Sequence, residues 1–227
     1  MSNIVPLYDN KKLIFTADGS ISLYNLDYGE AYHAVSMGAY TESLHKYVLA
    51  SEILKKILNK DMKLLDICFG IGLNLAVTIE KIAHLKKANN LSIVSLEKDK
   101  SLIHFVNKSY FLWPVDGYNI LRKLIETGIY QKIHLKLNLC DAVEYLMRSD
   151  DKFDIIYYDP FSRSKTPAFW DAILINKLYN LIQDGGCLVT YAGSNKIIKT
   201  FYKAGFNSHK ISKHTGSFLN SVIFYKP

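Results

Sequence analysis

The stretch LLDICFGIGLN, from Leu64 to Asn74, decides the fold class. Its apolar residues predict a strand that ends at Asp66, followed by a loop with Gly70 and Gly72 and then by a helix. Glycine allows the backbone to turn tightly and to approach a ligand closely. The motif is therefore typical of a loop that binds a nucleoside-type cofactor, although a tight turn without a ligand has the same pattern.

Short apolar runs alternate with helical stretches from Met62 onward, which indicates a doubly wound α/β sheet. Two further runs, FNSHKISKH and SFLNSVIFYKP, flank a turn signal at His214-Thr215-Gly216 and should pair as an antiparallel hairpin. We therefore predict a mostly parallel sheet of seven strands. The first five expected strands are KLLDI, LSIVSLE, IHLKLNL, FDIIYYD and GCLVTYA, and the expected helices cover about 73–86, 100–110, 141–148, 168–182 and 195–204.

The N-terminal part has a different pattern. An Asp18-Gly19 turn signal between KLIF and SISLY predicts a small β-hairpin. Apolar residues at helical spacing from Thr41 to Leu58 predict an amphipathic helix with Thr41 as its cap. We expect residues 1–60 to form an elaboration that packs on a catalytic domain of residues 61–227, in one compact unit.

The composition excludes several classes of protein. Hydrophobic residues make up 49% and charged residues 22% of the chain, as in ordinary globular proteins. There is no apolar run near the roughly 18 residues of a membrane span, and the N-terminus lacks a signal-peptide pattern, so we expect a cytoplasmic protein without membrane contact. The three cysteines and the pair His33 and His45 lack ligand spacing, so no metal site is expected.

The charge is uneven along the chain. Lysine and arginine outnumber aspartate and glutamate 28 to 21, and no acidic residue follows Asp184. A basic C-terminal quarter attracts a polyanion such as a nucleic acid, while a solvated basic face without a partner gives the same composition. The lysines after Asp184 are Lys196, Lys199, Lys203, Lys210, Lys213 and Lys226.

Acidic residues at the ends of successive expected strands extend the glycine motif into a cofactor site. Glu97 ends the second strand and can accept hydrogen bonds from ribose hydroxyls, and Asp141-Ala142 after the third strand can hold an adenine edge. A carboxylate at Asp66 would repel a pyrophosphate but favour a cationic group. S-adenosylmethionine therefore fits better than NAD or ATP, and the fold is expected to be of the class I S-adenosylmethionine-dependent methyltransferase, Rossmann-like type. The expected cofactor contacts here are Asp66, Gly70, Gly72, Asn74, Glu97, Asp141 and Ala142.

The fourth expected strand delivers Asp159 to the same edge of the sheet. Methyl transfer needs a positioned nucleophile, and an alkylamine with a pKa near 10.4 needs a carboxylate to orient it and to accept or relay its proton. Asp159 is the candidate catalytic residue. Phe161 and Trp170, unless they are core aromatics, are expected to form an aromatic wall, and Arg163 and Lys165 to meet phosphates.

The ordered series of motifs resembles the methyltransferase domain of the MnmC family, which modifies the wobble uridine of tRNA. The resemblance rests on TADGSISLYN, YGEAYHA, TESLHKYV, LLDICFGIGLN, LEK, CDA and DPFSRSKTPAFW, and covers most of the chain. It implies N-methylation of 5-aminomethyl-(2-thio)uridine at position 34 in the tRNA anticodon region, with S-adenosylmethionine as donor. It also implies that Tyr24 and Glu42 contact the cofactor and that Tyr28 closes over the amine, although a structural role fits each equally well.

The chain departs from the family pattern in several places. Cys68 replaces the first glycine of the loop, which suggests that this position does not touch the cofactor closely. Pro160 replaces a small residue and should stiffen its loop, and the ending SFLNSVIFYKP lacks an arginine-rich segment. The FAD-dependent oxidase domain of some members is absent from the sequence, so we expect no FAD, and we expect a separate protein to supply the aminomethyl substrate.

Two other functions remain open. An aminopropyltransferase resembling spermidine synthase would share the sheet and the acidic strand ends, but a basic C-terminal quarter would repel a polyamine. A non-catalytic tRNA-binding protein of this fold would have no chemical need for the acidic strand ends.

Overall fold

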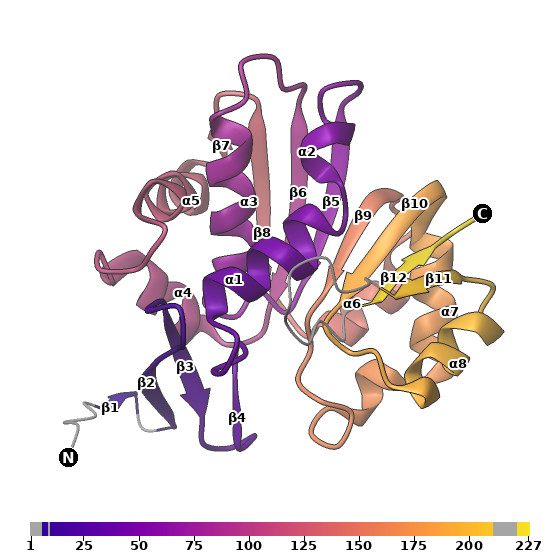
Figure 1. Cartoon of the computed structure of the whole chain (residues 1–227), viewed down its shortest axis with the longest axis horizontal. Coiled ribbons are helices and arrows are strands. Elements are labelled where there is room, and N and C mark those ends of the chain that lie inside the picture. The colour runs from indigo at the N-terminus through magenta and orange to yellow at the C-terminus, as the bar shows by residue number, and fades with distance from the viewer. Residues whose placement is uncertain (1–5, 9, 211–221) are drawn as a thin grey trace.

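The computed structural model describes residues 6–8, 10–210 and 222–227 of the chain. Its largest element is an eight-stranded sheet with the order β11-β12-β10-β9-β5-β6-β8-β7 (Figure 1). The five central strands are parallel, and the strands on both sides of them are antiparallel. The parallel strands are Met62–Ile67 (β5), Leu91–Glu97 (β6), Ile133–Leu139 (β8), Phe153–Tyr158 (β9) and Ile182–Thr190 (β10).

This topology confirms the predicted mostly parallel sheet with a C-terminal antiparallel pair. That pair consists of Asn207–Lys210 (β11) and Val222–Tyr225 (β12), while the predicted His214-Thr215-Gly216 turn lies outside the described residues. The two-residue strand Ile129–Tyr130 (β7) was not predicted and makes the sheet one strand larger than expected.

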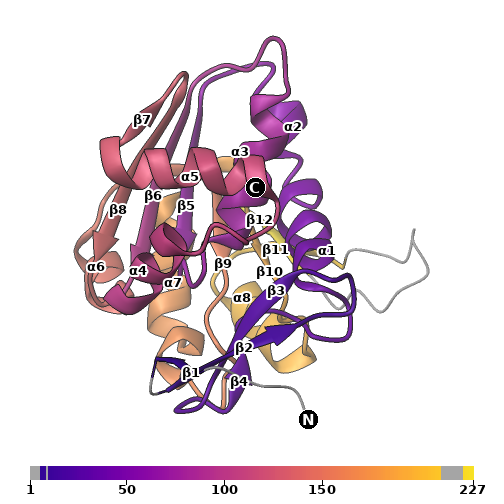
Figure 2. The same ribbon diagram turned by 90° about the vertical axis from the view of Figure 1, so that its left-hand side faces the viewer.

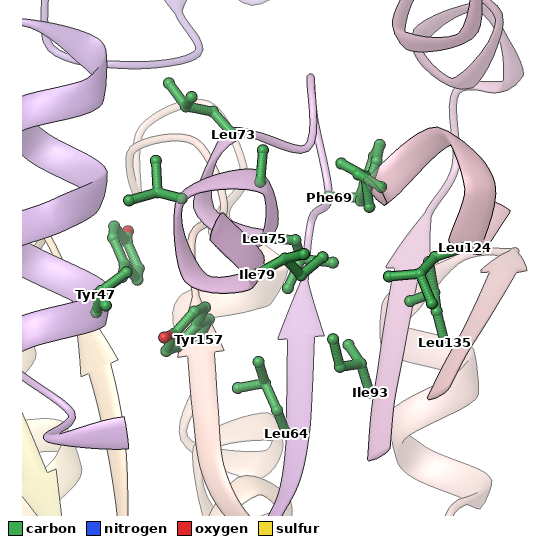
Figure 3. Close-up of a cluster of buried hydrophobic side chains, with 14 of the residues drawn as sticks. Tyr47, Leu64, Phe69, Leu73, Leu75, Ile79, Ile93, Leu124, Leu135 and Tyr157 are labelled. Atoms are coloured by element: carbon green, nitrogen blue, oxygen red, sulfur yellow. The ribbon is translucent and has the colours of Figure 1, made fainter. Parts of the chain in front are cut away.

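Both faces of the sheet are apolar, because consecutive side chains of a strand point to opposite sides and the central strands are apolar at consecutive positions. Leu64 packs in one buried cluster, and its neighbour Leu65 packs in another. The first cluster, shown in Figure 3, includes residues of Leu73–Ala83 (α3), Lys100–Lys108 (α4) and Val115–Thr127 (α5). The second includes residues of Ala142–Arg148 (α6), Ala172–Leu181 (α7) and Asn195–Lys203 (α8).

Most predicted helices are present, with two differences. The expected helix over 168–182 is divided into a short 3-10 helix, Pro167–Trp170 (η2), and α7, because Asp171 caps α7 by accepting a hydrogen bond from Ile173 N. The helix α5 was not predicted. Gly117 weakens its helical pattern but is required there, because a Cβ would lie 2.2 Å from the Ala76 carbonyl oxygen of α3.

The N-terminal part forms a four-stranded antiparallel sheet that Figures 1 and 2 show next to the main sheet. The predicted hairpin is present as its two central strands. Lys11 Nζ lies 2.5 Å from Asp99 Oδ2, which joins this sheet to the cap of α4. The four strands are Pro6–Tyr8 (β1), Lys11–Phe15 (β2), Ile21–Asn25 (β3) and Glu30–Ala31 (β4).

The predicted helix from Thr41 to Leu58 is wrong in detail. It is divided into Ala39–Ser43 (α1), the π-helix Leu44–Leu49 (η1) and Ile53–Lys56 (α2), with Glu52 in the left-handed region at φ 55°. Thr41 is not the cap. Asp18 of the β2–β3 turn accepts hydrogen bonds from Thr41 N and Oγ1, both at 2.8 Å, and so satisfies the helix start from outside the helix. In the described part of the chain, no helix has the length and apolar character to cross a membrane.

Candidate active site

A cavity of about 820 Å³ lies between the carboxyl ends of the parallel strands and the N-terminal sheet. Residues after β5, β6, β8 and β9 line one side, and residues from Asn25 to Val35 line the other. The volume suits a cofactor together with a small substrate group, and parallel sheets commonly bind ligands at this edge. The lining residues that were predicted as site residues are Tyr28, Glu42, Gly70, Glu97, Asp141, Ala142, Asp159 and Phe161.

Glu97 fixes the glycine loop. Its Oε2 accepts a hydrogen bond from Gly70 N at 2.8 Å, and its Oε1 accepts bonds from Lys98 N and Asp99 N, each at 2.8 Å. Burial raises the pKa of Glu97, and these bonds oppose the rise. Because a carboxylate has about four acceptor sites, one remains for a hydroxyl donor in the cavity.

Asp141 is held in place by the helix that it caps. Its Oδ1 accepts from Val143 N at 3.0 Å and from Glu144 N at 3.3 Å, and its Oδ2 accepts from Lys98 Nζ at 3.3 Å. Asp141 and Ala142 therefore present a fixed acidic edge and a backbone segment to the cavity.

Three of the predicted cofactor contacts lie behind the cavity wall. Asp66 is enclosed within the sheet, where it accepts a hydrogen bond from Ser95 Oγ at 2.6 Å, and burial raises its pKa to about 7. Gly72 has φ 72°, and a Cβ there would lie 2.5 Å from Phe69, so this glycine serves the turn itself. Asn74 is buried and contacts Asp159, so it acts on the cavity through that carboxylate.

Asp159 follows β9 and is held by two donors. The Tyr47 hydroxyl donates to Oδ1, and Asn74 Nδ2 donates to Oδ2 at 2.8 Å. Burial raises the pKa of Asp159, although the neighbouring His33 and these two donors oppose that rise. The result is a rigid carboxylate on the cavity wall with raised affinity for a proton.

A group of ionisable side chains next to Asp159 was largely missed by the sequence analysis. Glu42 Oε1 lies 2.7 Å from Lys46 Nζ, and Glu42 Oε2 accepts a hydrogen bond from Ala34 N at 2.6 Å and lies 3.7 Å from His33 Nδ1. His33, Glu42 and Lys46 are buried and line the cavity. The spacing of Glu42 and Lys46 on an expected helix was the one available signal, since residues four apart face each other. His33 had none.

Aromatic side chains close the cavity on the other side. The Phe161 ring lies 4.6 Å from that of Tyr28 and 5.1 Å from that of Tyr32, measured between centroids. Glu30 of β4 accepts hydrogen bonds from Ser162 N, at 2.9 Å, and from Ser162 Oγ, which joins the loop after β9 to the N-terminal sheet.

The remaining predicted contacts do not reach the cavity. Trp170 is a core residue that is 3% exposed and donates through Nε1 to the Phe161 carbonyl oxygen at 3.0 Å, so it supports the aromatic wall from behind. Arg163 and Lys165 are exposed outside the lining, and Tyr24 on β3 is not part of it either. Cys68, in contrast, lines the cavity, and the expectation that its position does not touch the cofactor closely stays a prediction.

Residues 101–217, more than half of the chain, match a family described as S-adenosyl-L-methionine-dependent methyltransferase. The chain belongs to this family. Its likeness to MnmC proteins is also confirmed: it is 25% identical over 217 residues to the bifunctional tRNA 5-methylaminomethyl-2-thiouridine biosynthesis protein MnmC of Leptospira interrogans, across 82% of this chain and 33% of that protein. An uncharacterized protein of Methanocaldococcus jannaschii is 23% identical, across 89% of this chain and 56% of that protein. The chain thus spans between a third and just over half the length of these relatives.

Solved structures support the fold. The crystal structure of MNMC2 from Aquifex aeolicus matches with a TM-score of 0.86 and 27% identity, covering 99% of this chain and 73% of that chain. Spermidine synthase from Thermotoga maritima matches with a TM-score of 0.57 and 12% identity, covering 96% of this chain and 70% of that chain. At that identity the second likeness concerns the fold alone.

Proposed function

We propose that the protein methylates the amine of 5-aminomethyl-(2-thio)uridine at position 34 in the anticodon region of tRNA. The observation that carries the proposal is the placement of Asp159 on a cavity wall whose neighbouring lining offers acceptors suited to a nucleoside. The MnmC relative, whose name describes biosynthesis of 5-methylaminomethyl-2-thiouridine in tRNA, supports the same substrate.

The lining fits S-adenosylmethionine. Gly70 gives close access to the backbone, Glu97 keeps one acceptor site for a ribose hydroxyl, and Asp141 with Ala142 offers an edge for adenine. The acidic side chain of Glu97 also favours a ligand with a positive charge. When bound, S-adenosylmethionine supplies an electrophilic methyl group.

Asp159 prepares the amine in this proposal. An alkylammonium that enters the cavity donates a hydrogen bond to this carboxylate and must lose a proton before its lone pair can react. Because burial raises the pKa of Asp159, its carboxylate is a better proton acceptor than an exposed one. Tyr47 and Asn74 fix the direction of the carboxylate and hence that of the amine.

An exposed basic helix face provides a docking surface for the tRNA. Lys196, Lys199 and Lys203 are exposed on α8, at positions that fall on one side of a helix. The α8 helix begins soon after Tyr191, which lines the cavity. Lys226 contributes less, because it lies 3.0 Å from Asp184 Oδ1, and Lys213 lies outside the described residues.

The test is to incubate the protein with labelled S-adenosylmethionine and tRNA that carries 5-aminomethyluridine, and then to identify the labelled nucleosides. We expect labelled 5-methylaminomethyluridine. Asp159→Asn should bind the cofactor as the wild type does and lose at least about 100-fold in kcat, whereas Asp184→Asn, at an 84% exposed side chain, should retain full activity. Cofactor binding without any labelled product would refute the proposal. Label transfer from decarboxylated S-adenosylmethionine to putrescine would instead support an aminopropyltransferase.

A further inference from the structure

The connection between α4 and α5 exposes an unusual set of large aromatic side chains. Tyr110 is 72% exposed, Phe111 53% and Trp113 45%. We call residues 109–114 the aromatic loop. Soluble proteins seldom leave such side chains together on the surface unless they bind something there.

Arg122 of α5 contacts the start of the aromatic loop. The guanidinium donates from Nε to the Val106 carbonyl oxygen at 2.9 Å and from Nη2 to the Ser109 carbonyl oxygen. It also lies 4.8 Å from the centroid of the Tyr110 ring. These contacts hold the Tyr110 ring in place, so less ordering is needed there when a ligand arrives, which favours binding.

The aromatic loop lies near the candidate active site. Lys100 and Leu102, in the first turn of α4, line the cavity, and α4 ends just before the aromatic loop. Its nine residues span roughly 13 Å. Trp113 contacts Tyr40 of α1, with 3.9 Å between ring centroids. In Figure 2 the connection from α4 to α5 lies between α5 and the N-terminal sheet. A ligand that fills the cavity and extends by two or three nucleotides can reach these rings.

The charges around the aromatic loop select the kind of ligand. Lys108, just before the aromatic loop, and Lys123 are exposed. Asp116, just after the loop, is exposed as well, and Lys81 is paired with Glu80 at 2.9 Å, so the two exposed lysines carry the positive charge here. Aromatic rings interleaved with cations bind single-stranded nucleic acid, because bases stack on the rings while the cations meet phosphates. A second copy of this chain fits less well, since a symmetric contact would bring the same lysines together.

We propose that Tyr110, Phe111 and Trp113 form a stacking platform for unpaired RNA bases next to the nucleotide that enters the cavity. The platform rests on the proposed function for its RNA partner. It adds a second contact on the side of the N-terminal sheet and α4, distinct from the phosphate contacts of the basic face of α8.

The experiment measures binding of two fluorescent RNA probes by anisotropy. One is a hairpin with the sequence of an anticodon stem-loop, and the other is a blunt duplex with the same number of base pairs as the hairpin stem. Tyr110→Ala and Trp113→Ala should each weaken hairpin binding by about 5- to 150-fold, the range expected for the loss of one stacked base. Duplex binding and the dependence of log Kd on log salt should stay unchanged, because no phosphate contact is removed.

Two variants act as controls. Tyr110→Phe keeps the ring and should bind the hairpin as the wild type does. Ile173→Ala removes a large apolar side chain that is 68% exposed on α7, a helix that packs on the other face of the sheet from α4 and α5, and should also have no effect. Because Tyr110 is so exposed, its replacement leaves the core intact.

The possible results separate the platform from the proposed reaction. Unchanged hairpin affinity in Tyr110→Ala and Trp113→Ala would refute it while leaving the proposed methylation standing. A dimer in light scattering that Trp113→Ala dissociates would assign the surface to self-association. If the wild type binds neither probe, the platform and the tRNA substrate both fail. If the stacking results are as expected but no methylated nucleoside forms, only the proposed reaction fails.

Discussion

Glu42→Gln should destabilise the protein because it breaks a buried ion pair from one side. The side chains of Glu42 and Lys46 are 7% and 8% exposed, and glutamine would leave the Lys46 ammonium without its counter-charge. Burial disfavours the Glu42 carboxylate, yet His33 and Lys46 lower its pKa from the ordinary 4.5 to about 2. That difference corresponds to about 3 kcal/mol of folding stability at neutral pH, which is close to the roughly 3 to 5 kcal/mol seen when one partner of a buried pair is removed.

The pH dependence gives the sharper test. Because the pKa of Glu42 is lower in the folded state, its contribution is complete above pH 4.5 and disappears as the pH falls towards 2. Urea unfolding followed by circular dichroism should show a deficit of about 3 kcal/mol for Glu42→Gln at pH 7, and a smaller one at pH 3. Asp150→Asn, which removes the 97% exposed partner of Lys177, should cost less than about 1 kcal/mol at either pH.

A second substitution separates the loss of the pair from other effects of glutamine. Lys46→Met removes the stranded ammonium, so the double variant with Glu42→Gln should recover much of the stability that the single variant loses. A deficit below about 1 kcal/mol at pH 7, or one of the same size at pH 3, would contradict the assignment of Glu42 as a buried carboxylate.

Tyr47→Phe removes a hydrogen bond to Asp159, so the pKa of Asp159 should rise further. The acidic limb of the pH profile of kcat should then move up by about one pH unit. An unmoved limb would exclude Asp159 as the titrating group. Cys68 has φ 69°, in the left-handed region, where glycine fits better than alanine. In urea unfolding, Cys68→Gly should therefore be more stable than Cys68→Ala by about 1 kcal/mol, whereas alanine is usually the more stable replacement. A more stable Cys68→Ala would show that this backbone is not left-handed. Glu30→Gln weakens the contact with Ser162. It should raise the KM for tRNA by about five-fold in steady-state assays, while cofactor affinity stays unchanged. A loss of cofactor affinity instead would mean that Glu30 supports the cofactor side of the cavity.

The parallel sheet could be predicted because its strands are buried on both faces and appear as continuous apolar runs. The same rule places the carboxyl ends of these strands at one edge, so Glu97, Asp141 and Asp159 were expected to meet, and they do line one cavity. Their roles toward a cofactor and a substrate stay predictions. Asp66 and Asn74 flank the glycine loop in the sequence, and both were expected to contact the cofactor. The sequence pattern does not reveal that their side chains lie behind the cavity wall.

The helix α5 and the division of the 41–58 segment could not be predicted for a related reason. Glycine is required at position 117 by the close approach of the Ala76 carbonyl oxygen. The Thr41 N–H at the helix start donates to Asp18, which lies in a turn far away in the sequence. Both contacts join segments that are separate along the chain. Local propensity describes neither, and tertiary packing decides both.

The boundary predicted at residue 60 stays a prediction, and the contacts argue against treating it as a functional boundary. Asp159 receives the Tyr47 hydroxyl from the N-terminal part, and the loop that follows Asp159 is joined to Glu30 through Ser162. His33 sits in a loop without any periodic pattern, and it reaches the cavity because Glu42 holds the neighbouring backbone. The strand ends therefore supply one half of the candidate site. The N-terminal part, through Tyr47, fixes the direction of the Asp159 carboxylate. Without residues before 60, Asp159 would lose the Tyr47 donor, although its strand and its place at the edge of the sheet would remain.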